Sequence, residues 1–251
     1  MLIKDQVLSD IESQKYTIRI AKTEEEVEAA LRLRYRVFKE ELNRQFTFSG
    51  QIDKDQYDDQ SHHLIVIDNG SEEVVGTYRL QTYEQARAGN GFVSEKRFRI
   101  DQFPDKVLQN AVEVGRACIS PEHRSGRVLF LLWKGFAGYL THFNKRYLFG
   151  YAAFSTTHLG TVLNTCRHLR EEGHYHPDYY IEARPQYKID QSKHAGSSND
   201  IDIPPLFENY LNVDSMVCSE PSFDDEVKLA HCLILLDVEN ISDRTRKLFF
   251  G

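Results

Sequence analysis

Residues 112–136 read VEVGRACISPEHRSGRVLFLLWKGF, and this stretch decides the fold. The apolar segment from Val112 to Ile119 predicts a strand, which Ser120 and Pro121 end. Apolar residues then recur at helical spacing from Val128 to Asn144 and predict a long helix. A strand, a short turn and a long apolar helix in succession are typical of a layered α/β fold.

The sequence on both sides continues the alternation of strands and helices. Two β-rich runs, Leu64 to Ile67 and Val74 to Leu80, flank Asp68-Asn69-Gly70 and predict a hairpin. Thr23 and Glu26 form a predicted capping box at the start of a helix. Further strands are expected at Tyr16 to Ile20, Tyr147 to Phe154 and His231 to Leu236, and further helices at Thr157 to Glu172 and Leu206 to Leu211.

Length, composition and charge limit the class of protein. With 251 residues, of which 41% are apolar, the chain can fill one large core, so we expect a single domain over residues 1–251. Residues 1–15 should form an N-terminal extension, and the polar stretch 190–204 a mobile loop. The formal net charge of −7 argues against nucleic acid as a partner, since phosphate binding depends on clustered Lys and Arg.

The chain shows no sequence signal for membrane insertion, secretion or metal binding. It has no run of about 18 apolar residues, and its first residues are too charged for a signal peptide. The cysteines, Cys118, Cys166, Cys218 and Cys232, lack CxxC spacing and are expected to be reduced and mostly buried. His174, His176 and Asp178 have none of the recognised metal-ligand spacings. We therefore expect a cytoplasmic protein with no metal site.

Glu113 and Arg116 are the candidate catalytic residues. They stand three positions apart, so on a regular strand their side chains would point to opposite faces. Both can serve one site only if Gly115 allows a bulge or a local bend. A carboxylate beside a desolvated surface can then act as a general base. The simpler alternative is an ordinary ion pair at the end of a strand.

The turn from Pro121 to Arg127 is a candidate phosphate site. It leads into the predicted helix, whose first backbone N–H groups lack partners within the helix and suit the phosphate of a pantetheine or nucleotide. The basic side chains of His123, Arg124 and Arg127 add to the positive field. The turn lacks the GxxxxGK[ST] pattern, so nucleotide hydrolysis is not indicated. An ordinary connection between a strand and a helix is the alternative.

A series of short motifs in a fixed order resembles one family of bacterial enzymes. The motifs are Arg34-Tyr-Arg-Val-Phe38, Asp55-Gln-Tyr-Asp58, His63-Leu-Ile-Val, Val75-Gly-Thr-Tyr-Arg79-Leu, Glu113-Val-Gly-Arg116 and Pro121-Glu-His-Arg-Ser-Gly-Arg. They resemble N-acyl amino acid synthases of the GNAT superfamily, and among these the ornithine-lipid type above all. The resemblance extends from Arg32 to Ile241. A more distant similarity, in the spacing of the polar residues, is to acyl-homoserine-lactone synthases.

The resemblance implies an α/β (α+β) fold of the GNAT type, with a mixed twisted sheet flanked by helices and a splayed cleft for acyl-pantetheine. It implies catalytic roles for Glu113 and Arg116. Acceptor-binding roles are implied for Arg34, Phe38, Asp55, Asp58 and Arg79. Roles in binding the acyl-pantetheine are implied for Ala117, Cys118, Ile119, Arg124, Ser125, Gly126 and Arg127.

The implied reaction needs two substrates and no bound cofactor. The partners are acyl carrier protein, whose phosphopantetheine thioester is the donor, and an amino acid acceptor. Basic side chains should dock the acidic carrier, and the candidates are Lys96, Arg97, Arg99, His123, Arg124, Arg127 and Lys134.

Several alternatives stay open at this point. The sequence departs from the ornithine-lipid group at residues 212–215 and at Ser219, which leaves ornithine, glycine and tyrosine open as acceptors. The acyl length, its 3-hydroxylation and a peripheral contact of the protein with the inner membrane are also undecided. Two other functions also stay open. The protein could be a synthase that makes acyl-homoserine lactone from S-adenosylmethionine, or a GNAT-like module that binds acyl groups without catalysis.

Overall fold

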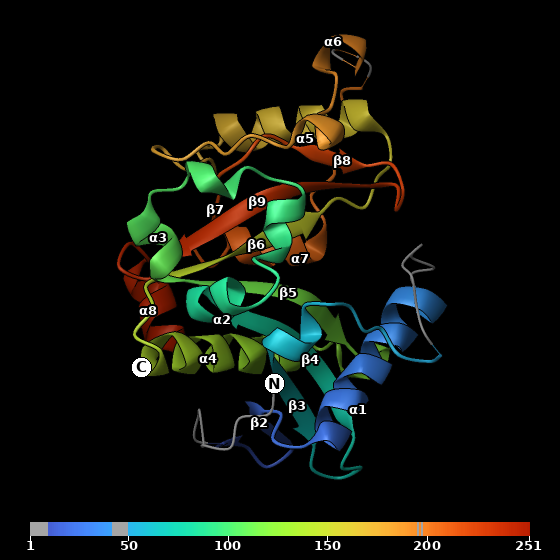
Figure 1. Ribbon diagram of the computed structural model, residues 1–251, viewed down its shortest axis with the longest axis vertical. Coiled ribbons are helices and arrows are strands. Elements are labelled where there is room, and N and C mark those ends of the chain that lie inside the picture. Colours follow the sequence, from blue (N-terminus) through green and yellow to red (C-terminus); the bar gives the residue numbers. More distant parts are fainter. Residues whose placement is uncertain (1–9, 42–49, 195, 197) are drawn as a thin grey trace. The chain divides into compact units, whose positions relative to one another are not determined.

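The computed structural model describes residues 10–41, 50–194, 196 and 198–251 (Figure 1). The chain divides into two compact units, which are described in turn. Unit 1 comprises Met1–Gly91, Val112–Arg146 and Arg246–Gly251, and unit 2 comprises Phe92–Ala111 and Tyr147–Thr245. Residues 1–9 of the expected N-terminal extension and positions 195 and 197 of the expected mobile loop lie outside the described residues. The single domain stays a prediction.

Unit 1 contains a sheet whose neighbouring strands are antiparallel. Its strands pair in sequence order and are β1 (Ile11–Glu12), β2 (Tyr16–Ile20), β3 (His62–Asp68), β4 (Val74–Thr82) and β5 (Ala111–Ile119). The predicted hairpin is confirmed as β3 and β4, and Asp68 stabilises its turn by accepting a hydrogen bond from the Gly70 N–H at 2.8 Å. Every residue of β4 is buried, as expected for a strand covered on both faces.

The alternation of residues along β3 shows which helix covers each face of this sheet. Ile65 packs with Ala30 and Leu33 of the helix α1 (Glu24–Tyr35). Its neighbour Leu64 lies against the helix α4 (Arg127–His142), at Gly135. Because successive residues of a strand point to opposite faces, α1 and α4 lie on opposite sides of the sheet.

The start of α1 agrees with the sequence only in part. Thr23 accepts a hydrogen bond from the Glu26 N–H at 3.2 Å, as a capping residue does. The Glu26 carboxylate accepts from the Lys22 N–H at 2.6 Å rather than from Thr23, so the second half of the predicted capping box is wrong. At its other end α1 continues directly into a π-helix, η1 (Arg36–Glu41).

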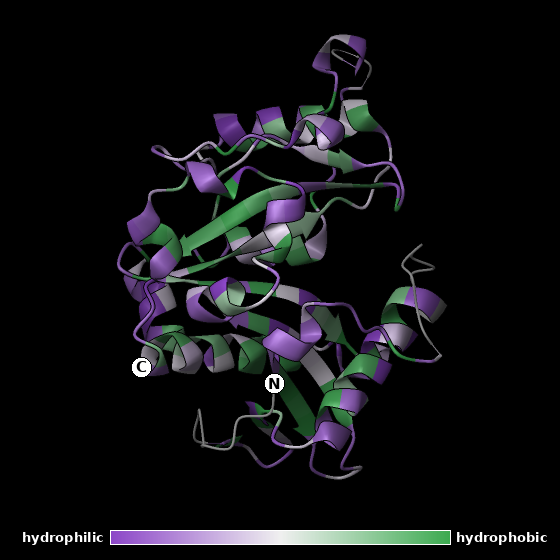
Figure 2. Ribbon diagram, in the orientation of Figure 1, coloured by the Kyte–Doolittle hydropathy of each residue, from purple (hydrophilic) through white to green (hydrophobic). Residues whose placement is uncertain are grey.

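Unit 2 is built on the long strand β9. Its strands are β6 (Tyr147–Ala153), β7 (Met216–Val217), β8 (Ser222–Asp224) and β9 (Leu229–Asp237). β6 pairs antiparallel with β9, as do β7 and β8, and β9 is apolar over most of its length (Figure 2). The helix α5 (Leu159–Glu171) brings Cys166 beside Cys232 of β9.

Shorter helices complete both units. They are η2 (Asp58–Gln60), α2 (Tyr83–Ala88), η3 (Val93–Lys96), η4 (Ile100–Gln102), α3 (Asp105–Gln109), η5 (Pro121–His123), η6 (Pro185–Tyr187), α6 (Gln191–His194), α7 (Pro205–Leu211) and α8 (Asp243–Phe249). The stretch expected to be a loop from residue 190 therefore contains α6. In the described part of the chain, none of the helices combines the length and apolar character that crossing a bilayer requires.

A substitution at Gly76 tests how closely β4 packs against α4. A Cβ at position 76 would lie 2.7 Å from Cγ1 of Val128, whose branched side chain on a helix has few alternative rotamers. Gly76→Ala should therefore lower the free energy of unfolding by about 1–3 kcal/mol. In the Val128→Ala background the same change should cost less, because the opposing methyl group is gone. Urea denaturation of the four proteins measures this, and equal losses in both backgrounds would contradict the packing.

Candidate active site

β5 bends at Arg116 and not at Gly115. In the ladder with β4, Gly115 pairs directly with Arg79, and Cys118 pairs with Thr77. Two residues, Arg116 and Ala117, therefore stand opposite Tyr78, which is the arrangement of a β-bulge. Arg116 itself takes the left-handed conformation, with φ of 55°, at a cost of about 1–2 kcal/mol for a residue with a side chain. The expected bend is present, but its expected position at Gly115 is wrong.

The ladder places Glu113 and Gly115 on the face of the sheet that α1 covers. His63 and Arg79 are partners across β3 and β4 on this face, and Gly115 is the partner of Arg79. Glu113 lies two residues before Gly115, so it shares the face. Its side chain is buried, whereas no atom of the described residues, apart from Gly115 and its two chain neighbours, lies within 4 Å of the position that a Cβ of Gly115 would occupy. An open space therefore lies over Gly115, on the same face of the sheet as the buried Glu113 and two residues from it.

A buried ion pair fixes the segment before β3 to α1. Arg34 of α1 donates from Nε to Asp53 at 2.9 Å and from Nη1 to Asp58 at 2.6 Å. The three side chains are at most 2% exposed. The backbone adds to the connection, since the Asp53 N–H donates to the Leu31 carbonyl at 3.1 Å. Burial of these charges is tolerable because each guanidinium and carboxylate has a geometrically good partner.

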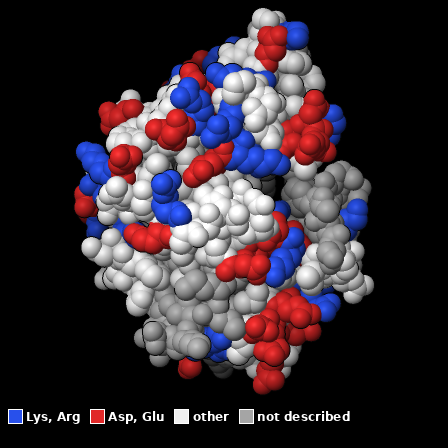
Figure 3. Space-filling view, viewed as in Figure 1, with Lys and Arg blue, Asp and Glu red and all other residues white. Residues whose placement is uncertain are grey.

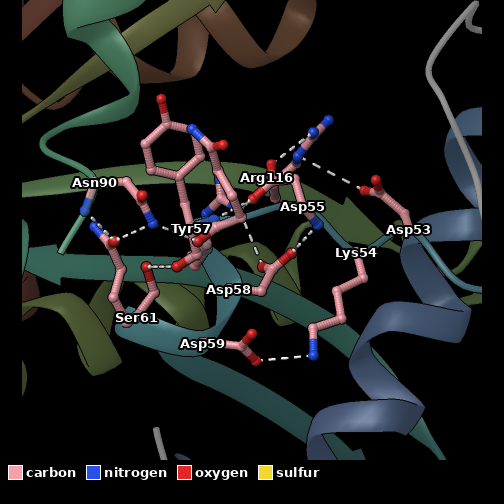
Figure 4. Close-up of polar contacts among 12 residues, drawn as sticks. Asp53, Lys54, Asp55, Tyr57, Asp58, Asp59, Ser61, Asn90 and Arg116 are labelled. Carbon is pink, nitrogen blue, oxygen red and sulfur yellow. Dashed lines mark hydrogen bonds and ion pairs between the residues drawn. The ribbon is translucent and has the colours of Figure 1, made fainter.

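Two further arginines extend this cluster toward solvent. Arg79 of β4 binds both Asp58, at 3.0 Å, and Asp55. Arg116 binds the other oxygen of Asp55 at 3.0 Å, and the two side chains point toward one another (Figure 4). Arg79 is 5% exposed, but Asp55 and Arg116 are 26% and 20% exposed. The three arginines and three aspartates balance in charge, and Asp55 and Arg116 are the members that a ligand can reach.

The electrostatic field of the cluster favours the ionised forms of Asp55 and Asp58. Burial alone would raise the pKa of Asp58, but the guanidinium groups of Arg34 and Arg79 outweigh it and hold that pKa well below its usual value. The pKa of Asp55 is lowered in the same way, against burial, by Arg79 and Arg116. Burial lowers the pKa of His63 to about 4, so this neighbouring imidazole is neutral and adds no charge.

The structure adds one residue to the expected set and clarifies the place of another. Asp53 was not expected from sequence, although its spacing from Asp55 and Asp58 in one short segment was a usable signal. Phe38 is half-buried, packs against the cluster of apolar residues under α1, and lies with its ring 5.7 Å from the Arg116 guanidinium. The Phe38 ring thus holds the Arg116 guanidinium in place through a cation–π contact, and its own packing fixes the ring.

The candidate phosphate turn is exposed and positively charged. Gly126, with φ of 85°, precedes α4, and neither a side-chain cap nor an acidic residue occurs in the described first turn of this helix. Arg124, Ser125 and Arg127 are exposed there, and Arg124 donates to the Ile119 carbonyl at 3.0 Å. The positive end of α4 is therefore open to an anion.

The structure confirms that Cys118 is buried, as expected, and corrects the expectation for Arg97. The Cys118 thiol is buried, and burial raises its pKa, which excludes a thiolate nucleophile at neutral pH. Arg97, a candidate for docking the carrier, is buried in unit 2 and paired with Asp224. It is therefore not part of a docking surface. Among the described residues, no group of three or more His, Cys, Asp or Glu side chains is arranged to hold a metal ion.

Comparison with known proteins assigns the chain to a family. Residues 33–134 match the acetyltransferase (GNAT) domain. The L-ornithine N(alpha)-acyltransferase of Brucella abortus (strain 2308) is 30% identical over 241 residues, which cover 90% of this chain and 86% of the relative. That of Agrobacterium fabrum (strain C58) is 30% identical over 255 residues, covering 93% and 84%. The chain belongs to the L-ornithine N(alpha)-acyltransferase family.

Membership of the L-ornithine N(alpha)-acyltransferase family confirms the resemblance found in the motifs. The protein is an N-acyltransferase of the GNAT fold, and it transfers an acyl group to an amino acid. The AHL synthase LasI has the same fold, with a TM-score of 0.53 and 11% identity over 95% of this chain and 96% of that chain. The more distant similarity expected from the motifs is thus a similarity of fold.

Asp58 tests the buried part of the cluster. Asp58→Asn should lower the free energy of unfolding by about 3 kcal/mol at neutral pH, because Arg34 and Arg79 lose a buried counter-charge. The folded pKa of Asp58 lies below its unfolded value, so its ionised form stabilises the protein above about pH 4 and this contribution is lost as the pH falls toward the folded pKa. The difference between wild type and variant should shrink as the pH falls.

Urea denaturation between about pH 6 and pH 3 measures this difference. Asp59→Asn is the matched control, because Asp59 is 78% exposed and pairs with Lys54 on the outside of the same segment (Figure 4). It should leave the unfolding free energy nearly unchanged. A loss in Asp58→Asn that stays constant over the pH range would contradict the role of its charge.

Proposed function

We propose that this protein transfers a long fatty acyl chain, with or without a 3-hydroxyl group, from acyl carrier protein to the α-amine of ornithine. The relatives that cover most of the chain are named for transfer to ornithine. The observation that carries the proposal is the arrangement on one face of the sheet. A buried Glu113 lies beside the space at Gly115, and the partly exposed pair of Asp55 and Arg116 is held at the neighbouring bulge.

Glu113 is proposed as the general base. An amino acid arrives with a protonated amine, which cannot attack a thioester until a proton is removed. The Glu113 carboxylate takes this proton directly or through one water molecule. The free amine then forms the new C–N bond with the acyl carbon, and the C–S bond breaks. The nitrogen loses its excess proton, the leaving pantetheine thiolate takes up one proton and departs as the thiol, and Glu113 returns the proton it accepted to solvent.

Asp55 and Arg116 are proposed to bind the acceptor. An α-amino acid carries a carboxylate and an ammonium group, which are the complements of a guanidinium and a carboxylate. Ornithine carries a second ammonium group, for which the carboxylate of Asp55 is a suitable partner. We assign Arg34, Asp58 and Arg79 to positioning, because they are nearly fully buried and bind one another or Asp55. Phe38 supports Arg116 from its packed position.

The bulge and the turn after β5 are proposed to bind the donor. Ala117 lies in the bulge, where the backbone leaves the regular ladder, so the N–H groups around Ala117 and Cys118 are candidates to stabilise the negative charge that develops on the thioester oxygen. The segment through Ile119 would guide the pantetheine. The first turn of α4, with Arg124, Ser125, Gly126 and Arg127, would bind its phosphate.

Acyl carrier protein is proposed as the donor because a small basic surface suits an acidic carrier. Figure 3 shows acidic and basic side chains interspersed over the described part of the face in view, so the attraction must be local rather than general. Arg124 and Arg127 supply such a local charge. The product is amphiphilic, and we propose a cytoplasmic enzyme that contacts the inner membrane at its surface to release it.

The mass of the product tests the proposed function. Purified protein should convert 3-hydroxyacyl carrier protein and ornithine into N-acyl ornithine, detected by mass spectrometry. Parallel reactions with glycine, tyrosine and S-adenosylmethionine, and with acyl-CoA as donor, identify another acceptor or donor if one is preferred. A lactone formed from S-adenosylmethionine, or binding of donor without any acylated product, would overturn the proposal.

Glu113→Gln should lower kcat by about 10²–10⁴-fold, because the amide cannot accept the proton of the acceptor. The KM for the acceptor should change little, and the loss should be smaller at high pH, where more acceptor amine is already neutral. Glu73→Gln, at the exposed turn of the β3–β4 hairpin, is the matched control and should keep full activity. Full turnover in Glu113→Gln would exclude this residue as the base.

Charge reversal tests the donor site. Arg124→Glu with Arg127→Glu should raise the KM for acyl carrier protein at least about tenfold at low salt and leave the KM for ornithine unchanged. The difference from wild type should narrow as salt screens both the attraction and the new repulsion. Arg87→Glu, at an exposed arginine of α2, is the control for reversal of a single surface charge away from the turn. An unchanged donor KM would exclude this turn from donor binding.

A further inference from the structure

Unit 2 contains a cavity that the proposed transfer reaction does not use. It has a volume of about 330 Å³ and lies between α5 and the segment that follows it. Its walls include Asn164, Arg167 and Arg170 of α5, and Tyr175 and Tyr180 of the following segment. The volume is at the small end of the range for sites that bind small molecules. None of the residues assigned to the donor, the acceptor or the base lines this cavity.

Arg170 is held in a fixed orientation at the wall of the cavity. Its guanidinium lies 4.3 Å from the ring centre of Tyr175 and 4.9 Å from that of Tyr180. Stacking on aromatic rings uses the face of a guanidinium and leaves its N–H groups directed outward from the edge. Arg170 is therefore held in one orientation, with the Tyr175 and Tyr180 hydroxyls close to its guanidinium, and its remaining N–H groups can donate to a ligand that accepts hydrogen bonds.

Arg167 adds a second positive charge to the same wall. It precedes Arg170 by three residues, a spacing that places both side chains on one face of α5. One of its N–H groups donates to the side-chain oxygen of Asn164, and Asn164 in turn donates to the Asp200 carbonyl at 2.8 Å. This chain of hydrogen bonds orients Arg167 without neutralising it.

The charge of the cavity has no counterpart in the described part of the chain. None of its lining residues is an aspartate or a glutamate, and neither Arg167 nor Arg170 forms an ion pair with a described residue. Two like charges at this spacing on a helix repel one another and destabilise it. The pair is stabilised when an anion lies between the two guanidinium groups.

The hydroxyl of Tyr175 supplies one more donor. It is buried and makes no hydrogen bond of normal geometry with a described residue, although the Cys166 thiol and the Arg170 guanidinium lie close to it, so a ligand or water that accepts from it would offset the cost of its burial. Burial raises the pKa of Tyr175, so its hydroxyl stays protonated and able to donate. Leu163 and Pro221 provide an apolar part of the lining.

We propose that this cavity binds a small oxyanion, a carboxylate or a phosphate group, between Arg167 and Arg170. The rest of the ligand, beyond its oxyanion group, lies toward Leu163 and Pro221. Carboxylates and phosphates both present oxygen atoms that accept hydrogen bonds from guanidinium groups, so the experiment includes one probe of each kind. This site is separate from the donor phosphate site at α4, and its existence does not depend on the transfer reaction.

Chemical-shift titration of the full-length protein with inorganic phosphate, and separately with butyrate, tests the site. At least one probe should give saturable shifts of amide signals in residues 160–180. Binding should weaken at least about tenfold in Arg170→Gln and in Arg167→Gln, because each variant removes a charged hydrogen-bond donor. Arg87→Gln is the matched surface control and should bind as wild type does. Thermal unfolding of each variant verifies that it is folded.

The outcomes separate the possibilities. Saturation by phosphate alone or by butyrate alone identifies the anion class, and saturation by both shows that the site reads the shared oxyanion. Shifts confined to residues 124–128 would mean that the anion binds at α4, which overturns the proposal. Shifts that never saturate, or that persist unchanged in both α5 variants, would overturn it as well.

Discussion

The buried ion pair between Arg34 and Asp58 is the constraint on which the proposed active-site face of unit 1 depends. Both side chains are 1% exposed, so neither charge can be left without its partner except at a cost of several kcal/mol. Arg34 comes from α1 and Asp58 from the segment before β3, and Arg79 of β4 also binds Asp58. Helix, segment and sheet are therefore held in one arrangement, because any other arrangement would leave a buried charge unpaired.

This constraint extends to the surface through Asp55. Its backbone N–H donates to the Asp58 carboxylate at 2.7 Å, so the buried pair fixes where the Asp55 side chain can reach. Asp55 in turn binds Arg116, which stands at the bulge of β5 in a left-handed conformation. The cost of that conformation is comparable to the gain from one charged hydrogen bond. A rigid ionic base thus positions a strained, partly exposed residue three positions after Glu113 on the same strand, as the proposed active site requires.

The sequence predicts the order of helices and strands well, because their periodicity is local. It predicts less well the features that tertiary contacts decide. Gly115 was expected to bend β5, but its pairing with Arg79 keeps it in the ladder, and the bulge falls on Arg116 instead. In the sequence, Asp53 resembles a solvated loop aspartate. Only the folded structure shows that it is buried and paired with Arg34. In the sequence, Arg97 likewise resembles a surface charge. Its ion pair with Asp224, 127 positions away, depends on the tertiary fold and cannot be seen in the local sequence.

We propose that Asp55 and Arg116, held by the buried cluster, bind the acceptor as one unit. A kinetic double-mutant cycle tests it most directly, with Asp55→Asn, Arg116→Gln and the double variant, and kcat/KM for ornithine as the measured quantity. We predict that the double variant loses little more activity than the worse single variant, which corresponds to a coupling energy of about 1–3 kcal/mol. Losses that simply add would contradict the claim, because they would show that the two residues act independently.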